Sequence, residues 1–380
     1  MKISSWVVRR SPAPLGLHVR HTKQTQRPYR VTALMAIAAA LLSTLTTAQA
    51  QPDPSGIDFV TIGAPGNAAY QSIIPNDFVN GRGSVGYEYR LGRYEVTTQQ
   101  WVEFFNAAYD RADARLPHLL PPDFWGASPT TPNTPGRQRW TVPSGNEMRP
   151  VGDISWRMAA MYCNWLTNGK SSNRAAFLSG AYEVSTFGFN GGIFTDQLVH
   201  SPGAQYWIPT WDEWLKAAHY DPAKQNSDGS LGGWWQYSNA SDTPYTYGPP
   251  GTGQANAGFT NPGPFSISLG AYATTSPWGL YDMAGGTTEW TESVRTTNDG
   301  RRSRVFDGSH WGEDGFQALL GDRIRSARSE FPHIPTYEFG LRIASTIPAP
   351  GPWAIGTGAL CTLGLRRKRG GSWSGSGQLR

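Results

Sequence analysis

Cysteine and charged residues are both scarce in this sequence of 380 residues. The only cysteines are Cys163 and Cys361, so zinc fingers and iron–sulfur clusters, which need several thiolates each, are excluded. Charged residues make up 16% of the chain, too few for a coiled coil or an all-helical bundle. Disorder is excluded as well, because 12% of the residues are aromatic and give a core ample apolar surface to bury. With 44 glycines and 29 prolines, the sequence predicts a globular protein rich in loops.

Basic residues are concentrated at the two ends of the chain. Residues 1–50 contain seven Lys or Arg and residues 346–380 contain five, and neither segment contains an acidic residue. The central segment, 51–345, keeps 21 basic and all 28 acidic residues, which is a formal net charge of −7. Because an acidic body repels a polyanion, the sequence argues against a nucleic-acid partner.

The first 50 residues have the pattern of a secretory signal peptide. A basic leader precedes the apolar run VTALMAIAAALLSTLTT, and Ala48-Gln49-Ala50 follows as the cleavage motif. The alternative is a membrane anchor, but the run is shorter than the roughly 18–20 residues that span a bilayer. We therefore expect an exported protein that is periplasmic, on the outer surface or extracellular.

The C-terminal end resembles a PEP-CTERM sorting tail. Residues 346–369 contain a Pro-rich lead, a short apolar segment and the basic cluster Arg366–Arg369, and residues 370–380 form a flexible tail. A terminal helix packed on the domain is the alternative, and three glycines within the apolar segment disfavour it. The resemblance implies transient membrane contact before the tail is processed.

Three segments carry the signals of a helix N-terminus. These signals are the capping boxes Thr97–Gln100 and Thr210–Glu213 and the N-cap residue Ser155. Apolar residues follow each signal at helical spacing, which predicts three short helices. After Pro222, Gly, Asn, Ser and Thr dominate, so the sequence predicts no helix for over a hundred residues and few strands. The fold class expected is α+β with a high content of coil.

Several segments, taken in order, resemble the formylglycine-generating enzyme family, also called the sulfatase-modifying-factor domain. The resemblance implies a coil-rich variant of the C-type lectin fold over residues 51–345. The matching blocks are YEVTTQQWVEFFNA (94–107), RPVGDISWRMAAMYCNWL (149–166), IPTWDEWLKAAH (208–219), SPWGLYDMAGGTTEWTES (276–293) and FGLRIAS (339–345), with a weaker match at RVFDGSHW (304–311).

The segment DMAGGTTE is the candidate calcium site. Carboxylate and loop carbonyl oxygens suit Ca²⁺, and the adjacent glycines let the backbone turn its carbonyls inward. The resemblance implies a structural calcium held by Asp282, Gly285, Thr287 and Glu289. The alternative is that the two carboxylates only bond to neighbouring backbone amides. A second family calcium site would begin at Asn256 and Ala257, but its downstream acidic residue is missing.

The family's oxidase chemistry depends on two thiolates that bind Cu(I), a soft cation that prefers sulfur. Residues 304–345 contain no cysteine, and an ungapped alignment places Glu313 and Ala318 at the two thiol positions. His310 replaces the active-site serine in the same alignment. We therefore expect no copper.

The remaining cysteine of the body is predicted to be structural. Cys163 aligns with a helical cysteine that relatives pair with one in the last strand, where this chain has Ile343. A small buried apolar role is therefore the simplest expectation. The tryptophans of the matching blocks are expected to fill the core, with stacking on sugars as the alternative; they are Trp214, Trp278, Trp290 and Trp311.

A non-haem iron centre is not supported, because no pair of histidines has the spacing of a facial set of two His and a carboxylate. The five histidines of the body are His118, His200, His219, His310 and His333. His310 with Glu313 is the remaining candidate for a metal site or a general base.

Three functions are therefore open at this stage. The first is a calcium-stabilised binding or envelope-associated module, with an unknown protein or glycan partner, that keeps the fold without copper chemistry. The second is a family oxidoreductase that uses non-cysteine ligands. The third is a lectin-like glycan binder. Fold alone does not choose between them.

Overall fold

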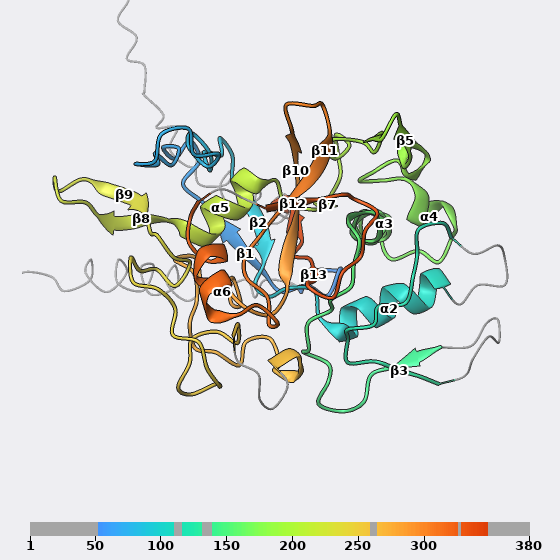
Figure 1. Cartoon of the computed structure of the whole chain (residues 1–380). Coiled ribbons are helices and arrows are strands. Elements are labelled where there is room, and N and C mark those ends of the chain that lie inside the picture. Colours follow the sequence, from blue (N-terminus) through green and yellow to red (C-terminus); the bar gives the residue numbers. More distant parts are fainter. Residues whose placement is uncertain (1–51, 110–115, 131–138, 259–263, 326–327, 349–380) are drawn as a thin grey trace, which may run out of the picture. The chain divides into compact units, whose positions relative to one another are not determined.

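The computed structural model describes residues 52–109, 116–130, 139–258, 264–325 and 328–348 (Figure 1). The expected signal peptide lies outside these residues, and so does the expected sorting tail beyond residue 348. Within the described ranges, no helix is both long and apolar enough to span a bilayer.

The described residues form short helices and strands separated by long irregular segments. The helices are α2 (Thr98–Tyr109), α3 (Trp156–Thr167), α4 (Ala175–Leu178), α5 (Trp211–His219) and α6 (Gly315–Gly321), with 3₁₀ turns at Val184–Thr186 and Pro264–Ser266. The strands are β1 (Phe59–Ile62), β2 (Tyr89–Gly92), β3 (Ser128–Pro129), β4 (Trp140–Thr141), β5 (Phe189–Asn190), β6 (Ile193–Phe194), β7 (Tyr206–Trp207), β8 (Tyr220–Gln225), β9 (Leu231–Trp234), β10 (Thr288–Thr296), β11 (Arg302–Asp307), β12 (Arg328–Glu330), β13 (Phe339–Gly340) and β14 (Ala344–Ser345).

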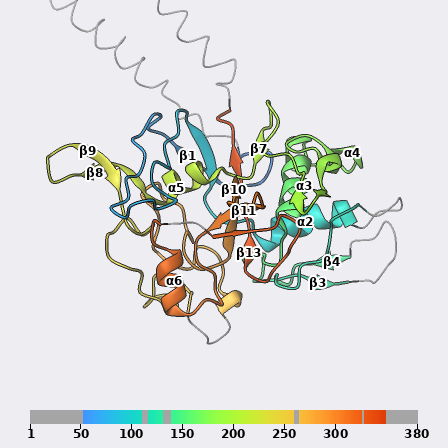
Figure 2. The same cartoon turned by 45° about the horizontal axis from the view of Figure 1, so that its top comes forward.

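Two four-stranded sheets connect distant parts of the chain. One has the order β1-β2-β14-β7, and the other has the order β12-β11-β10-β13. The pairing of β10 with β13 is parallel, while β10 and β11 are antiparallel. Figures 1 and 2 both place these strands between α2, α3 and α4 on one side and α5 and α6 on the other. As a result, the segments before β10, after β2 and after β13 meet in the interior.

All three predicted helix starts are confirmed. Thr210 accepts a bond from the amide of Glu213, whose carboxylate accepts the amide of Thr210 in return. Thr97 and Gln100 make the equivalent reciprocal pair at 3.3 and 3.1 Å. Ser155 accepts the amide of Met158. Each cap satisfies amides that the helix itself leaves free, which is why the local signal was reliable.

The prediction for the region after Pro222 was wrong in two respects. Strands β10 and β11 of that region pair with each other, although their sequences carry many polar residues. Helix α6 was also missed, because glycine occupies both its first and its last position. Its N-cap, Asp314, accepts the amides of Phe316 and Gln317 and so starts the helix despite the weak propensity.

Aromatic rings fill part of the core, and the prediction that the tryptophans of the matching blocks lie there is confirmed for two of the four. Trp214 and Trp290 are buried, whereas Trp278 and Trp311 are only partly buried. Cys163 is a free, fully buried thiol, and burial raises its pKa well above the ordinary value. This thiol is therefore a packed apolar side chain and not an exposed nucleophile.

Candidate functional site

The candidate calcium loop, residues 282–287, runs directly into β10 and has no space for larger side chains. Gly285 and Gly286 have positive φ angles of 79° and 61°. A Cβ on Gly285 would lie 2.2 Å from Oδ1 of Asn256, and one on Gly286 would lie 2.3 Å from Oε1 of Glu95. Only glycine fits both the backbone angle and these contacts. The loop is therefore held against two polar side chains from other parts of the chain.

Glu95 lies behind this loop, and sequence reasoning did not single it out. Its carboxylate accepts the backbone amide of Thr287 at 3.0 Å and the Thr287 hydroxyl at 2.7 Å. The side chain is only 2% exposed. Burial, followed by the charge of nearby Glu289, raises the pKa of Glu95 well above its usual range. Glu95 thus anchors the loop, but its surroundings disfavour the ionised form of its carboxyl group.

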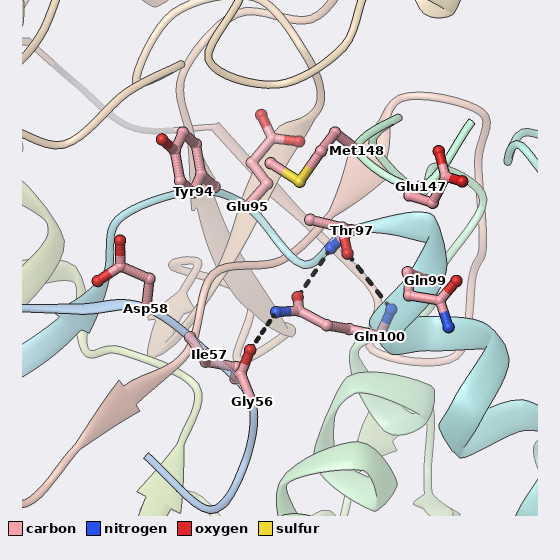
Figure 3. A pocket seen from close by; sticks show the side chains of 10 residues that line it. All are labelled: Gly56, Ile57, Asp58, Tyr94, Glu95, Thr97, Gln99, Gln100, Glu147 and Met148. Atoms are coloured by element: carbon pink, nitrogen blue, oxygen red, sulfur yellow. Dashed lines mark hydrogen bonds between the residues drawn. The ribbon is translucent and has the colours of Figure 1, made fainter. Parts of the chain in front are cut away.

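The same residue borders a pocket of about 290 Å³. Figure 3 shows the Glu95 carboxylate beside Tyr94 and Met148, while Gln100 bonds to Gly56 and Thr97 elsewhere in the pocket. The pocket therefore adjoins the residue that anchors the calcium loop.

Glu289 forms a buried ion pair with Arg342. The guanidinium Nη2 lies 2.7 Å from Oε1, and Nε lies 3.0 and 3.1 Å from the two carboxylate oxygens. Trp214 donates its indole N–H to Oε2 at 2.7 Å. Arg342 also donates to the carbonyl of Gly92, and neither charged side chain is exposed by more than 2%. The pair joins β10, α5 and the segment between β13 and β14 in one network.

Asp282 begins the loop and is partly buried. Its Oδ2 accepts the amide of Gly270 at 2.6 Å. Burial raises the pKa of Asp282 to about 6, against the opposing effects of that hydrogen bond and of the Arg342 charge. Asp282 thus accepts a backbone amide, as the alternative to calcium required, whereas Glu289 bonds to the side chains of Arg342 and Trp214 and not to backbone amides.

The charge balance around the loop nevertheless fits a cation. Three carboxylates, from Glu95, Asp282 and Glu289, lie near a single guanidinium, that of Arg342. The excess negative charge is relieved either by protonation of Glu95 or by a bound cation. Among the described residues, no three His, Cys, Asp or Glu side chains are grouped as metal ligands. The calcium set implied by the resemblance needs only two carboxylates, together with carbonyl oxygens of the loop.

The second candidate calcium site, Asn256 with Ala257, lies against the same loop. Oδ1 of Asn256 accepts the amide of Gly286 at 2.8 Å, and Ala257 is fully buried. Residues 259–263, which follow, lie outside the described part of the chain. Asn256 therefore acts as a brace for the candidate calcium loop.

His310 and Glu313 lie close together but do not form a His–carboxylate pair. The Glu313 carboxylate makes an ion pair with Arg328 and accepts the backbone amide of His310 at 3.3 Å. The nearest carboxylate to the His310 ring belongs to Glu338, 3.6 Å from Nε2. Burial and the charge of Arg328 lower the pKa of His310 to about 4.

The tautomer of neutral His310 follows from one contact. The amide of Gly312 donates to Nδ1 at 3.1 Å, so Nδ1 must be the acceptor and Nε2 must carry the proton. Neither nitrogen then offers a free lone pair to a metal ion or to a substrate proton. Ala318, at the other expected thiol position, is fully buried in α6.

Four aromatic rings gather beside His310, and we call them the ring cluster. Neighbouring centroids lie 5.7–5.9 Å apart, and the His310 ring lies 5.5 Å from the nearest of them. All four side chains are partly or well exposed, and the most exposed, Tyr337, reaches 43%. The members are Phe124, Phe265, Trp311 and Tyr337. Only Trp311 had been considered from the sequence, because the other three lie in loops without a motif.

The architecture and the site define the class of protein. A family model described as the sulfatase-modifying factor enzyme 1-like domain matches residues 47–347. The chain belongs to this family, and the expected coil-rich α+β variant of the C-type lectin fold is confirmed.

Similar solved structures have low sequence identity to this chain. CarF is 18% identical, with a TM-score of 0.48 over 77% of this chain and 99% of CarF. Treponema denticola variable protein 1 is 17% identical, with a TM-score of 0.44 over 77% and 95%. PvdO from Pseudomonas aeruginosa is 16% identical, with a TM-score of 0.38 over 77% and 92%. A comparison with curated protein sequences finds no match.

Proposed function

We propose that this chain is an exported binding protein that uses the family fold without copper oxidase chemistry. The observation that carries the proposal is the ion pair between Arg328 and Glu313, the residue aligned with the first copper thiol. Its carboxylate is neutralised by Arg328, and the ring cluster lies beside the neighbouring His310. Cu(I) is a soft cation that selects thiolates, and a carboxylate already paired with arginine is a poor substitute.

An oxidoreductase with non-cysteine ligands is less well supported by the same residues. Its strongest candidate ligand, His310, has its Nδ1 lone pair occupied by the Gly312 amide. Its strongest candidate carboxylate, Glu313, is committed to Arg328. A binding role requires neither group to react.

The proposal includes export and a structural calcium. Residues 1–50 would direct export, and residues 346–369 would hold the protein at the membrane until processing. Calcium would be held by the Asp282 carboxylate and by loop carbonyls of Gly285 and Thr287, where it would offset the excess negative charge. Glu289, the fourth ligand that the resemblance implies, would have to give up part of its bonding to Arg342 and Trp214 to reach the ion. Its role would be to stabilise the loop that enters β10.

The copper test uses the purified chain and a chromophoric Cu(I) chelator. We expect no transfer of Cu(I) to the protein and no oxidation of a cysteine-containing peptide, because the aligned positions lack thiolates. The matched variant E313C/A318C restores two thiols at those positions and should gain Cu(I) binding. Tight Cu(I) binding by the unmodified chain, or peptide oxidation, would overturn the proposal.

Glycan binding is a second candidate, favoured by the exposure of the ring cluster. Partly exposed rings offer flat apolar faces, with His310 and Glu338 as polar neighbours that suit a hydroxylated ligand. On a glycan array, we expect binding that falls at least tenfold with Tyr337→Ala. Phe316→Ala is the control, because Phe316 is 65% exposed and lies outside the cluster. Equal losses in the two variants, or no glycan bound, would reject this candidate.

A further inference from the structure

A separate cavity of about 440 Å³ lies at the start of α3, where the matching block 149–166 contributes Ser155 and Arg157 to its wall. Apolar side chains, including Leu116, Leu120 and Pro335, form part of its wall. The polar part of the wall consists of Ser155, Arg157, His118 and His333. The cavity has the size of a small-molecule site and combines apolar walls with a few converging polar groups.

Arg157 is the central polar group of this cavity. It is only 4% exposed, and its Nε and Nη2 bond to the two oxygens of Asp196 at 2.9 and 2.7 Å. Nη2 also donates to the carbonyl of Gly188 at 3.0 Å. The guanidinium lies over the rings of Phe187 and Phe189. Within the described residues, Nη1 makes no hydrogen bond, so this nitrogen remains available to a ligand.

Two imidazoles complete the polar wall. His118 packs edge-on against Phe187 and His333 against Phe189, the same rings that flank Arg157. In the part of the chain that the structure describes, neither imidazole has a hydrogen-bond partner. The hydroxyl of Ser155 accepts the Met158 amide, which leaves its proton free to donate.

Both imidazoles of the cavity are affected by the same nearby charges. Partial loss of contact with water and the positive charge of Arg157 lower the pKa values of both His118 and His333, while Asp196 opposes this shift for both and Glu330 for His333. Asp196 balances the Arg157 charge, so the net charge of the cavity depends on the two rings, and a bound anion would favour protonation of both.

We propose that this cavity binds the carboxylate of a small organic acid, with Arg157 Nη1, the Ser155 hydroxyl and the two imidazoles as donors. The apolar body of the ligand would contact Leu116, Leu120 and Pro335. Arg157 presents a charged planar donor of the kind that suits carboxylates, and the apolar wall favours a hydrophobic body over inorganic anions. The proposal is independent of the copper and glycan proposals, because it uses none of their residues.

The probe is benzoate, which is titrated into the full chain at about pH 7.5 and at about pH 5.5. Binding is followed by NMR of labelled histidine rings. Benzoate stays ionised over this range, whereas the two imidazoles gain protons as the pH falls. We therefore expect saturable shifts of the His118 and His333 signals and roughly tenfold tighter binding at the lower pH.

The variant H118Q/H333Q should bind benzoate with less than a twofold change between the two pH values. Both side chains are exposed, so the variant should fold. H200Q is the matched control, because His200 pairs with Glu292 elsewhere, and it should behave as the unmodified chain does. Benzyl alcohol tests whether the carboxylate is needed. Equal affinity for the alcohol, no saturable shift, or an unchanged pH dependence in H118Q/H333Q would overturn the proposal.

Discussion

Replacing Arg342 with methionine is expected to lower the free energy of unfolding by about 3–5 kcal/mol, measured by urea denaturation. The substitution leaves Glu289 buried and without its cation, close to Glu95 and Asp282. Removing one partner of a buried ion pair is costly, because the remaining charge can neither reach water nor find another partner. Arg342 also donates to the Gly92 carbonyl, which would lose its donor.

Two further variants make this result interpretable. R301Q breaks a surface pair whose side chains are 72% and 60% exposed, and it should cost less than about 1 kcal/mol. E289M/R342M removes both charges and should recover part of the stability lost in R342M. If R342M lowered the free energy of unfolding no more than R301Q does, the ion pair of Arg342 with Glu289 would not stabilise the fold as inferred.

Calcium at about a hundredfold excess over its dissociation constant is expected to stabilise the protein by about 2.7 kcal/mol relative to EDTA. The ion would offset the negative charge of Glu95, Asp282 and Glu289 that Arg342 alone does not balance. The measurement is thermal unfolding in calcium and in EDTA, followed at constant ionic strength. An increase in Tm of several degrees is the expected result.

D282N separates a bound ion from a general salt effect. The variant should lose the response to calcium, and in EDTA it should be no less stable than the unmodified chain, because it removes a carboxylate whose charge is disfavoured. The raised pKa of Asp282 also means that stability in EDTA falls as the pH rises from 3.8 to about 6. D299N, at an exposed acidic residue, is the control and should keep the full response. A calcium-independent Tm would contradict the structural calcium.

Local signals in the sequence predicted the parts of the fold that depend on neighbouring residues. The caps at Thr97, Ser155 and Thr210 were correct, because each bonds to an amide three residues away. The same logic failed for α6, whose glycines hide a helix that Asp314 starts. It also failed for β10, because a strand with many polar residues is stabilised here by its pairing with β11 and β13.

The candidate site was predictable only in part. Asp282 and Glu289 were found because they lie in one short motif with two glycines. Glu95 and Arg342 were missed, although both lie within matching blocks, because a single charged residue in a block does not reveal its partner. Glu95 is 192 residues from Thr287, which it anchors, and Arg342 is 53 residues from Glu289.

By itself, the sequence determined the family, the helix starts, the acidic body and the lack of a second body thiol, because these depend on counts and on short-range patterns. Tertiary structure decided which carboxylates share one guanidinium, which lone pair of His310 is occupied, and which rings gather around it. Those properties depend on distances between segments far apart in the chain, and burial gives each of them its energetic weight.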